Sequence, residues 1–151
     1  MIPNIFLLRP IGAFGPHPDH DAHIHATLSA IQILIMQDAF DRLDVDRITK
    51  CKSHLPPARR LVILYPDGAF GTVILSLQQP SGVFAGDKYG EIDTRFLYCA
   101  VNALSLLGRL HELDVEKTVD YIRRCKNFDG GFGHVIGAES HSAQGMLSLL
   151  L

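Results

Sequence analysis

Residues 93–133 read DTRFLYCAVNALSLLGRLHELDVEKTVDYIRRCKNFDGGFG, and two helical patterns follow one another within them. The first pattern covers residues 94–110 and is apolar on nearly every side, which is typical of a helix buried among other elements. Asp93 is its expected N-cap, because an aspartate can accept hydrogen bonds from the free amides of a first helical turn. Gly108 lies near its end. We expect this helix to be buried.

The second pattern starts at Asp114, another candidate N-cap, and is amphipathic. Its apolar residues stand at positions i, i+4 and i+7, namely Val115, Val119 and Ile122. This spacing predicts a helix with one apolar side. Cations near its end suit the negative pole of a helix dipole, and they are Arg123, Arg124 and Lys126. We expect this helix to lie on the outside of the fold.

The same two-helix unit occurs elsewhere in the chain. LDVDRI at 43–48 resembles LDVEKT at 113–118, and three glycine–phenylalanine turns occur, GAFG at 12–15, GVFAG at 82–86 and GGFG at 130–133. The last two turns are 48 residues apart, whereas the first two, like the two LDV motifs, are 70 apart. The 22 additional residues fall between about Cys51 and Val73, where Pro56 and Pro57 cannot continue a helix.

A period of about 48 residues made of two helices is typical of helical repeat proteins. The first copy offers a buried helix at 22–40 and begins its amphipathic helix at 44–50. The last copy offers its turn and the start of a buried helix at 141–151. We therefore predict an all-α fold, a partial α/α barrel with an inner and an outer helical layer. Residues 1–151 would form one incomplete domain with an insertion at about 51–73, because the ending GMLSLLL is no polar cap.

Composition supports a globular domain and argues against some partners. Of the 151 residues, 47% are hydrophobic and 20% are charged. A net charge of -2 and a pI near 6.4 do not favour nucleic acid or an anionic membrane surface as partners. The apolar run at 5–8 ends at Arg9 and is too short for a signal peptide core or a membrane span. A cytoplasmic protein is the expectation.

The three cysteines, Cys51, Cys99 and Cys125, are an odd number without a CxxC spacing. We expect reduced thiols, without a disulfide framework or a zinc knuckle. The segment HPDHDAHIH, with four histidines from His17 to His25, has two interpretations. It could bind a metal, or it could be a polar loop with solvated histidines.

Other candidate residues also have structural interpretations beside functional ones. His141 could contact a ligand or cap a helix, and Arg95 could contact a substrate or pair with Glu91 or Asp93. Tyr98 fits a buried helix by its spacing alone. The glycines at 130–133 are most simply turn residues, and we see no phosphate-binding loop in them.

Residues 86–144 resemble the β subunits of protein prenyltransferases, and among them those of the type II, or Rab, geranylgeranyltransferases. The resemblance rests on GEIDTRF at 90–96, NFDGGFG at 127–133, and ESH at 139–141 followed by Gln144. The resemblance covers approximately residues 12–50 and 74–144. No counterpart of the family's C-terminal half is expected in this sequence. The resemblance implies an α/α barrel around an apolar funnel, which agrees with the repeat.

The resemblance also implies an activity and a site. Family members of this type transfer geranylgeranyl from geranylgeranyl diphosphate to C-terminal cysteines of Rab GTPases. The implied partners are a prenyltransferase α subunit and a Rab GTPase with its Rab escort protein. By resemblance, His141, Ser142 and Ala143 meet the diphosphate, while Arg95 and Tyr98 face the funnel.

Zinc is the cofactor that the resemblance implies, but its aspartate, cysteine and histidine ligands come from later repeats of the family and have no counterpart in this chain. We therefore assign no metal ligand and no catalytic residue. A second hypothesis is a catalytically inactive helical-repeat fragment that binds an α subunit or a lipid. A third hypothesis is another helical-barrel isoprenoid enzyme such as a terpene cyclase, which would need an acidic motif such as DxDD that the sequence lacks.

Overall fold

The computed structural model describes residues 7–8, 13–17, 20–43, 45, 48 and 74–149 of the chain. Four α-helices carry the described fold: α1 (Ile24–Met36), α3 (Thr94–Leu106), α4 (Val115–Arg124) and α5 (Ser142–Leu149). Three short 3-10 helices accompany them, namely η1 (Phe40–Arg42), η3 (Ile74–Leu77) and η4 (Leu110–Glu112). The predicted all-α class is confirmed. The expected insertion at 51–73 lies outside the described residues, and so does most of the amphipathic helix expected from residue 44 on.

A two-residue antiparallel pairing joins β1 (Leu7–Leu8) to β2 (Phe14–Gly15) ahead of the first helix. Leu7 lies opposite Gly15, and Leu8 lies opposite Phe14. The last two residues of the apolar run at 5–8 thus form a strand. Within the described residues, no helix is long and apolar enough to cross a membrane.

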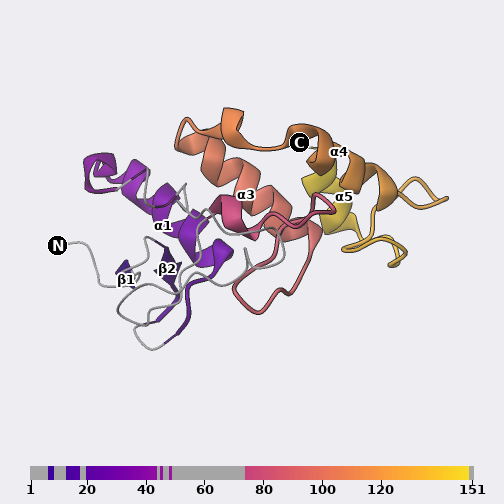
Figure 1. The fold of residues 1–151 in the computed structure, drawn as a ribbon, viewed down its shortest axis with the longest axis horizontal. Coiled ribbons are helices and arrows are strands. Elements are labelled where there is room, and N and C mark those ends of the chain that lie inside the picture. The colour runs from indigo at the N-terminus through magenta and orange to yellow at the C-terminus, as the bar shows by residue number, and fades with distance from the viewer. Residues whose placement is uncertain are drawn as a thin grey trace.

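The inner helices lie side by side, with α3 between α1 and α5 (Figure 1). A backbone hydrogen bond ties the start of α1, and another the start of α3, to the loop before the inner helix that follows. The amide of Ile24 in α1 donates to the carbonyl of Gly86, and the amide of Thr94 in α3 donates to the carbonyl of His134, both over 2.9 Å. Consecutive repeats are therefore joined at the same end of the inner layer.

The backbone hydrogen bonds confirm the repeat and both of its spacings. At an offset of 48, the bond from Gln79 N to Val83 O recurs from Asn127 N to Gly131 O, each over 2.8 Å. At an offset of 70, the bond from Ala39 N to Leu34 O recurs from Arg109 N to Leu104 O, again over 2.8 Å. Equivalent residues therefore have equivalent local structure in the two copies.

Both long inner helices end four residues earlier than predicted. The helix expected to reach Phe40 ends at Met36, and the one expected to reach 110 ends at Leu106. A residue with positive φ follows each end, Asp38 at 50° and Gly108 at 68°. This left-handed conformation stops an α-helix, and the chain continues into η1 or η4.

The core lies between the inner helices and the elements that cover them. Its largest fully buried side chains include Phe84, Ile31, Leu97 and Leu104. The buried Cys99 and Cys125 are free thiols, as predicted, while Cys51 lies outside the described residues.

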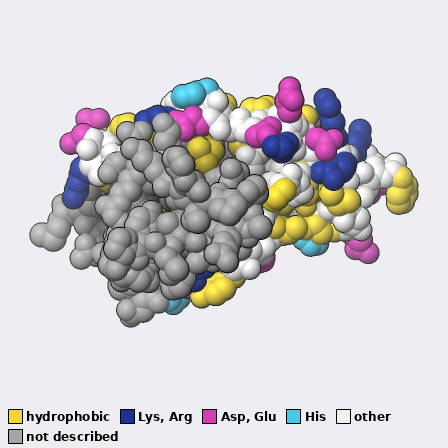
Figure 2. All heavy atoms as spheres, viewed as in Figure 1, with side chains coloured by type: hydrophobic (Ala, Val, Ile, Leu, Met, Phe, Trp, Pro, Cys, Tyr) yellow, Lys and Arg dark blue, Asp and Glu magenta, His cyan; other side chains and the backbone are white. Residues whose placement is uncertain are grey.

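The predicted apolar side of α4 was partly wrong. Val115 is 49% exposed and Val119 is half-buried, whereas the helix buries Thr118, Tyr121 and Ile122. A polar contact explains the difference, since the Gln78 side-chain amide donates to Thr118 Oγ1 over 3.0 Å. This hydrogen bond holds Thr118 against the loop that precedes α3. On the opposite side of α4, charged side chains gather at the surface (Figure 2).

Candidate functional site

Each inner helix begins with a polar side chain that accepts a hydrogen bond from the amide two residues later. His23 Nδ1 accepts from the amide of residue 25 over 3.2 Å, and Asp93 Oδ1 accepts from that of Arg95 over 2.7 Å. His141 Nδ1 accepts from the amide of Ala143 over 3.2 Å. The three caps stand nine residues after the repeated phenylalanines at 14, 84 and 132. The capping roles considered for Asp93 and His141 are thus present.

The cap of α3 also forms an ion pair with an exposed arginine. Arg95 donates from Nε over 3.0 Å and from Nη2 over 2.7 Å, both to Asp93 Oδ2. The Asp93 side chain is 5% exposed and that of Arg95 49%. Burial alone would raise the pKa of the Asp93 carboxyl, but the hydrogen bonds from Arg95 outweigh it and lower that pKa. The pairing considered from the sequence is therefore observed, and it leaves half of the arginine side chain accessible.

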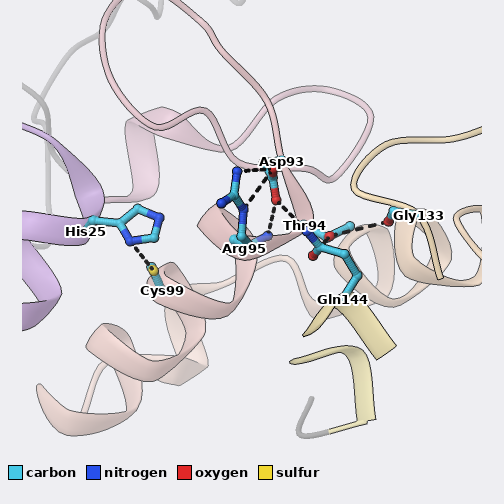
Figure 3. A network of polar contacts seen from close by, with 7 residues as sticks. All are labelled: His25, Asp93, Thr94, Arg95, Cys99, Gly133 and Gln144. Carbon is cyan, nitrogen blue, oxygen red and sulfur yellow. Dashed lines mark hydrogen bonds and ion pairs between the residues drawn. The ribbon is translucent and has the colours of Figure 1, made fainter. Parts of the chain in front are cut away.

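A hydrogen-bonded pair joins the starts of α3 and α5. Thr94 Oγ1 donates to Gln144 Oε1 over 2.6 Å, and both residues are buried. Gln144 Nε2 lies 3.5 Å from Asp93 Oδ1. Figure 3 shows Gln144 extending from α5 toward Thr94 and Asp93. The sequence analysis quoted Gln144 as part of a motif but did not find this contact.

The less buried stripe of α3 carries both residues predicted to face a funnel. Arg95 is exposed, while Tyr98 and Asn102 are half-buried at positions i+3 and i+7 from it. Asn102 Nδ2 donates to the Tyr98 hydroxyl over 3.1 Å. On α5, Ser142 is exposed and Ala143 is half-buried in the first turn. The structure thus places Arg95 and Tyr98 on one stripe, and the Gln144 contact brings the first turn of α5 beside the start of that stripe.

A thiol and an imidazole meet between α1 and α3. His25 Nδ1 lies 3.9 Å from Cys99 Sγ. Burial raises the pKa of the Cys99 thiol to about 11, and burial also lowers the pKa of His25. Both shifts favour the neutral form, which makes Cys99 a poor thiolate nucleophile and a poor metal ligand.

The histidine-rich loop is tied to the loop that precedes α3. Asp21 accepts hydrogen bonds from Lys88 Nζ over 2.8 Å and from the Tyr89 hydroxyl over 3.0 Å. The His17 and His20 rings lie 5.4 Å apart, and the His23 ring stacks on its neighbour at position 25. Within the part of the chain that the structure describes, no three His, Cys, Asp or Glu side chains form a group that could hold a metal ion. The donors present there do not fit zinc.

Comparison with known proteins gives a consistent result. Residues 4–149 match the family described as the prenyltransferase alpha-alpha toroid domain. The geranylgeranyl transferase type-2 subunit beta of Saccharomyces cerevisiae is 44% identical over 138 residues, which is 91% of this chain and 37% of that protein. The protein of the same name from Candida albicans is 45% identical over 133 residues, 88% of this chain and 36% of that protein.

A solved structure confirms the similarity of fold. The Candida albicans protein geranylgeranyltransferase-I complexed with GGPP matches with a TM-score of 0.69 at 20% identity. The match covers 94% of this chain and 38% of that chain. At this identity, the likeness shows the toroid fold alone. The present chain spans somewhat more than a third of the length of these relatives.

Proposed function

The chain belongs to the prenyltransferase α/α toroid domain family, and from this we propose that it is a segment of a type II protein geranylgeranyltransferase β subunit. The observation that carries the proposal is the identity of 44% and 45% to two type-2 β subunits over about nine tenths of the chain. The complete enzyme would transfer geranylgeranyl from geranylgeranyl diphosphate to C-terminal cysteines of Rab GTPases. It would act in the cytoplasm with a prenyltransferase α subunit and the Rab escort protein.

The residues that we assign to geranylgeranyl diphosphate are His141, Ser142, Ala143, Arg95 and Tyr98. A departing diphosphate needs a cation and hydrogen-bond donors. Arg95 is half-exposed and supplies the cation. Because His141 Nδ1 accepts a backbone hydrogen bond, the neutral ring carries its proton on Nε2, where it can donate to a phosphate oxygen. Tyr98, three residues along the stripe, would border the isoprenoid.

In the reaction implied for the whole enzyme, a zinc ion would hold the sulfur of the attacking substrate cysteine as a thiolate. The described part of this chain offers no donor set for it, so we assign no step to a metal held by these residues. The contribution proposed for them is to bind and orient the diphosphate substrate.

A binding measurement with a cap-preserving variant tests the assignment. In His141→Asn, the amide oxygen can still cap α5, but the Nε2 donor is lost. We expect the variant to bind geranylgeranyl diphosphate about fivefold to tenfold more weakly than wild type, as the loss of a hydrogen bond to a charged group implies. His111→Asn, in the exposed turn η4, is the matched control. Equal affinity of the two variants would contradict the assignment.

A transfer assay separates the proposal from the second hypothesis. The 151-residue chain, coexpressed with an α subunit, would be given labelled geranylgeranyl diphosphate and a Rab GTPase bound to its escort protein, with and without zinc. Zinc-dependent transfer would support an active enzyme. Binding of the diphosphate without transfer would favour the catalytically inactive fragment, and binding of neither the diphosphate nor the α subunit would contradict both.

A further inference from the structure

The carboxylate of Asp93 is buried, yet the cation that it pairs with is half-exposed. Its two oxygens together accept three hydrogen bonds from Arg95, one from the backbone amide and two from the guanidinium. An isolated buried carboxylate is costly, and a partner that satisfies its oxygens removes much of that cost. The pair therefore holds the guanidinium in one orientation at the start of α3.

This arrangement leaves one side of the guanidinium available. Nε and Nη2 are directed to Asp93, whereas no described protein atom accepts a hydrogen bond from Nη1. The fork geometry of a guanidinium suits an anion of phosphate type. Figure 3 shows Asp93 on one side of Arg95, and Gln144 of α5 lies beyond Asp93 and Thr94 on that same side.

Gln144 connects this ion pair to the turn that we assign to the diphosphate. It accepts from Thr94 Oγ1 over 2.6 Å and approaches Asp93 Oδ1 with its own Nε2. It also belongs to the first turn of α5, three residues after His141. A displacement of α5 relative to α3 would break these buried contacts.

We propose that Asp93 and Gln144 are positioning residues, which hold the Arg95 guanidinium at a set orientation and distance from the first turn of α5 so that both grip one diphosphate. This inference rests on the proposed function. Asp93 acts through Arg95 and does not touch the substrate, so replacing Asp93 weakens diphosphate binding even though it removes a negative charge from the neighbourhood of an anion.

The test compares two aspartates that cap helices. Asp93→Asn and Asp114→Asn both keep a capping side chain, and both remove the partner of a cation, Arg95 or Lys117. The affinity of the 151-residue chain would be measured for geranylgeranyl diphosphate and for the neutral alcohol geranylgeraniol. We expect Asp93→Asn to weaken diphosphate binding about tenfold and to change alcohol binding less than about twofold. Asp114→Asn should change neither.

A double-mutant cycle shows whether Asp93 acts through Arg95. In an Arg95→Ala background, Asp93→Asn should produce no further loss of diphosphate affinity. Gln144→Met, which keeps the volume and removes both hydrogen bonds, should weaken diphosphate binding about threefold in the wild type, as one neutral hydrogen bond implies, and not in the Arg95→Ala background.

Each other outcome has a distinct meaning. An equal loss from Asp93→Asn with and without Arg95, an equal loss for diphosphate and alcohol, or tighter diphosphate binding would overturn the positioning role. If wild type itself binds the diphosphate no better than the alcohol, the proposed function fails instead.

Discussion

At the scale of single residues, His23 combines two properties that make it sensitive to protonation. Its Nδ1 must be unprotonated to cap α1. Burial beside the Phe96 ring, whose centroid lies 5.2 Å from that of His23, lowers its pKa from the ordinary 6.5, although Asp87 and Glu91 oppose this shift. The neutral form is therefore the one that the fold favours.

The expected consequence is a loss of stability in mild acid. Because the folded pKa lies below that of the unfolded chain, the free energy of unfolding is highest above about pH 6.5 and falls as the pH drops toward the folded pKa. His23→Asn keeps a capping side chain that does not titrate, so its melting temperature should fall by less between pH 7.5 and 5.5. Circular dichroism melts would measure this, with His111→Asn as the control. An unchanged pH dependence in His23→Asn would contradict the assignment.

Single residues also show which site features could be predicted. Asp93 as the cap of α3 and its pairing with Arg95 were both foreseeable, because these contacts join residues two positions apart. The hydrogen bond between Thr94 and Gln144 spans 50 positions, and no local pattern marks it. The sequence shows only a glutamine near the start of an apolar helix, and its burial is a finding of the structure.

At the scale of elements, α4 shows how a polar contact can override hydrophobic periodicity. Spacing predicted that Val115 would be buried, but the contact of Thr118 with Gln78 fixes which side of the helix faces inward. The Gln78 amide also donates to the carbonyl of Asp114 over 3.2 Å, at the helix start. The loop before α3 and the outer helix α4 therefore form one packed unit.

Two truncations on α4 test which side is buried. Ile122→Ala removes a side chain that is 7% exposed and should lower the free energy of unfolding by about 2–3 kcal/mol. Val115→Ala should lower it by less than about 0.5 kcal/mol, as is usual at the surface. Urea denaturation would measure both. A larger cost at Val115 than at Ile122 would mean that the helix is turned the other way.

At the scale of the whole molecule, the glycines Gly82 and Gly130 occupy equivalent turn positions in two repeats but have different surroundings. Gly82 and Gly130 both have positive φ, 98° and 83°, and both donate to a carbonyl three residues earlier. A methyl group on Gly82 would lie 2.1 Å from the carbonyl oxygen of Lys117 in α4, whereas one on Gly130 would meet nothing within 4 Å. Of these two turns, the one at Gly82 is packed directly against the outer helix α4.

Alanine at these two positions separates backbone strain from packing between repeats. Gly130→Ala should cost about 1 kcal/mol, the strain of a left-handed alanine. Gly82→Ala should cost more by about 1–3 kcal/mol, because α4 must also shift away from the turn. Thermal unfolding of both variants gives the comparison. Equal costs would show that α4 is not seated on the turn at Gly82.

The helical class, the repeat with its offsets of 48 and 70 residues, and Asp93 as the cap of α3 could all be predicted from local sequence patterns, whereas His23 as the cap of α1 was missed. These features depend on hydrogen bonds between near neighbours and on side-chain periodicity, which a sequence displays directly. Helix ends were less predictable, since Asp38 in the left-handed conformation ends α1 four residues early.

Only the packing of the helices settles which side of α4 is buried and brings Gln144, in the first turn of α5, to Thr94 and Asp93. These outcomes depend on polar groups that meet across long stretches of chain. Such groups are buried only when each finds a hydrogen-bond partner, and the partner is selected when whole helices pack together. The arrangement of the candidate site is therefore a property of the assembled layers and not of any one segment.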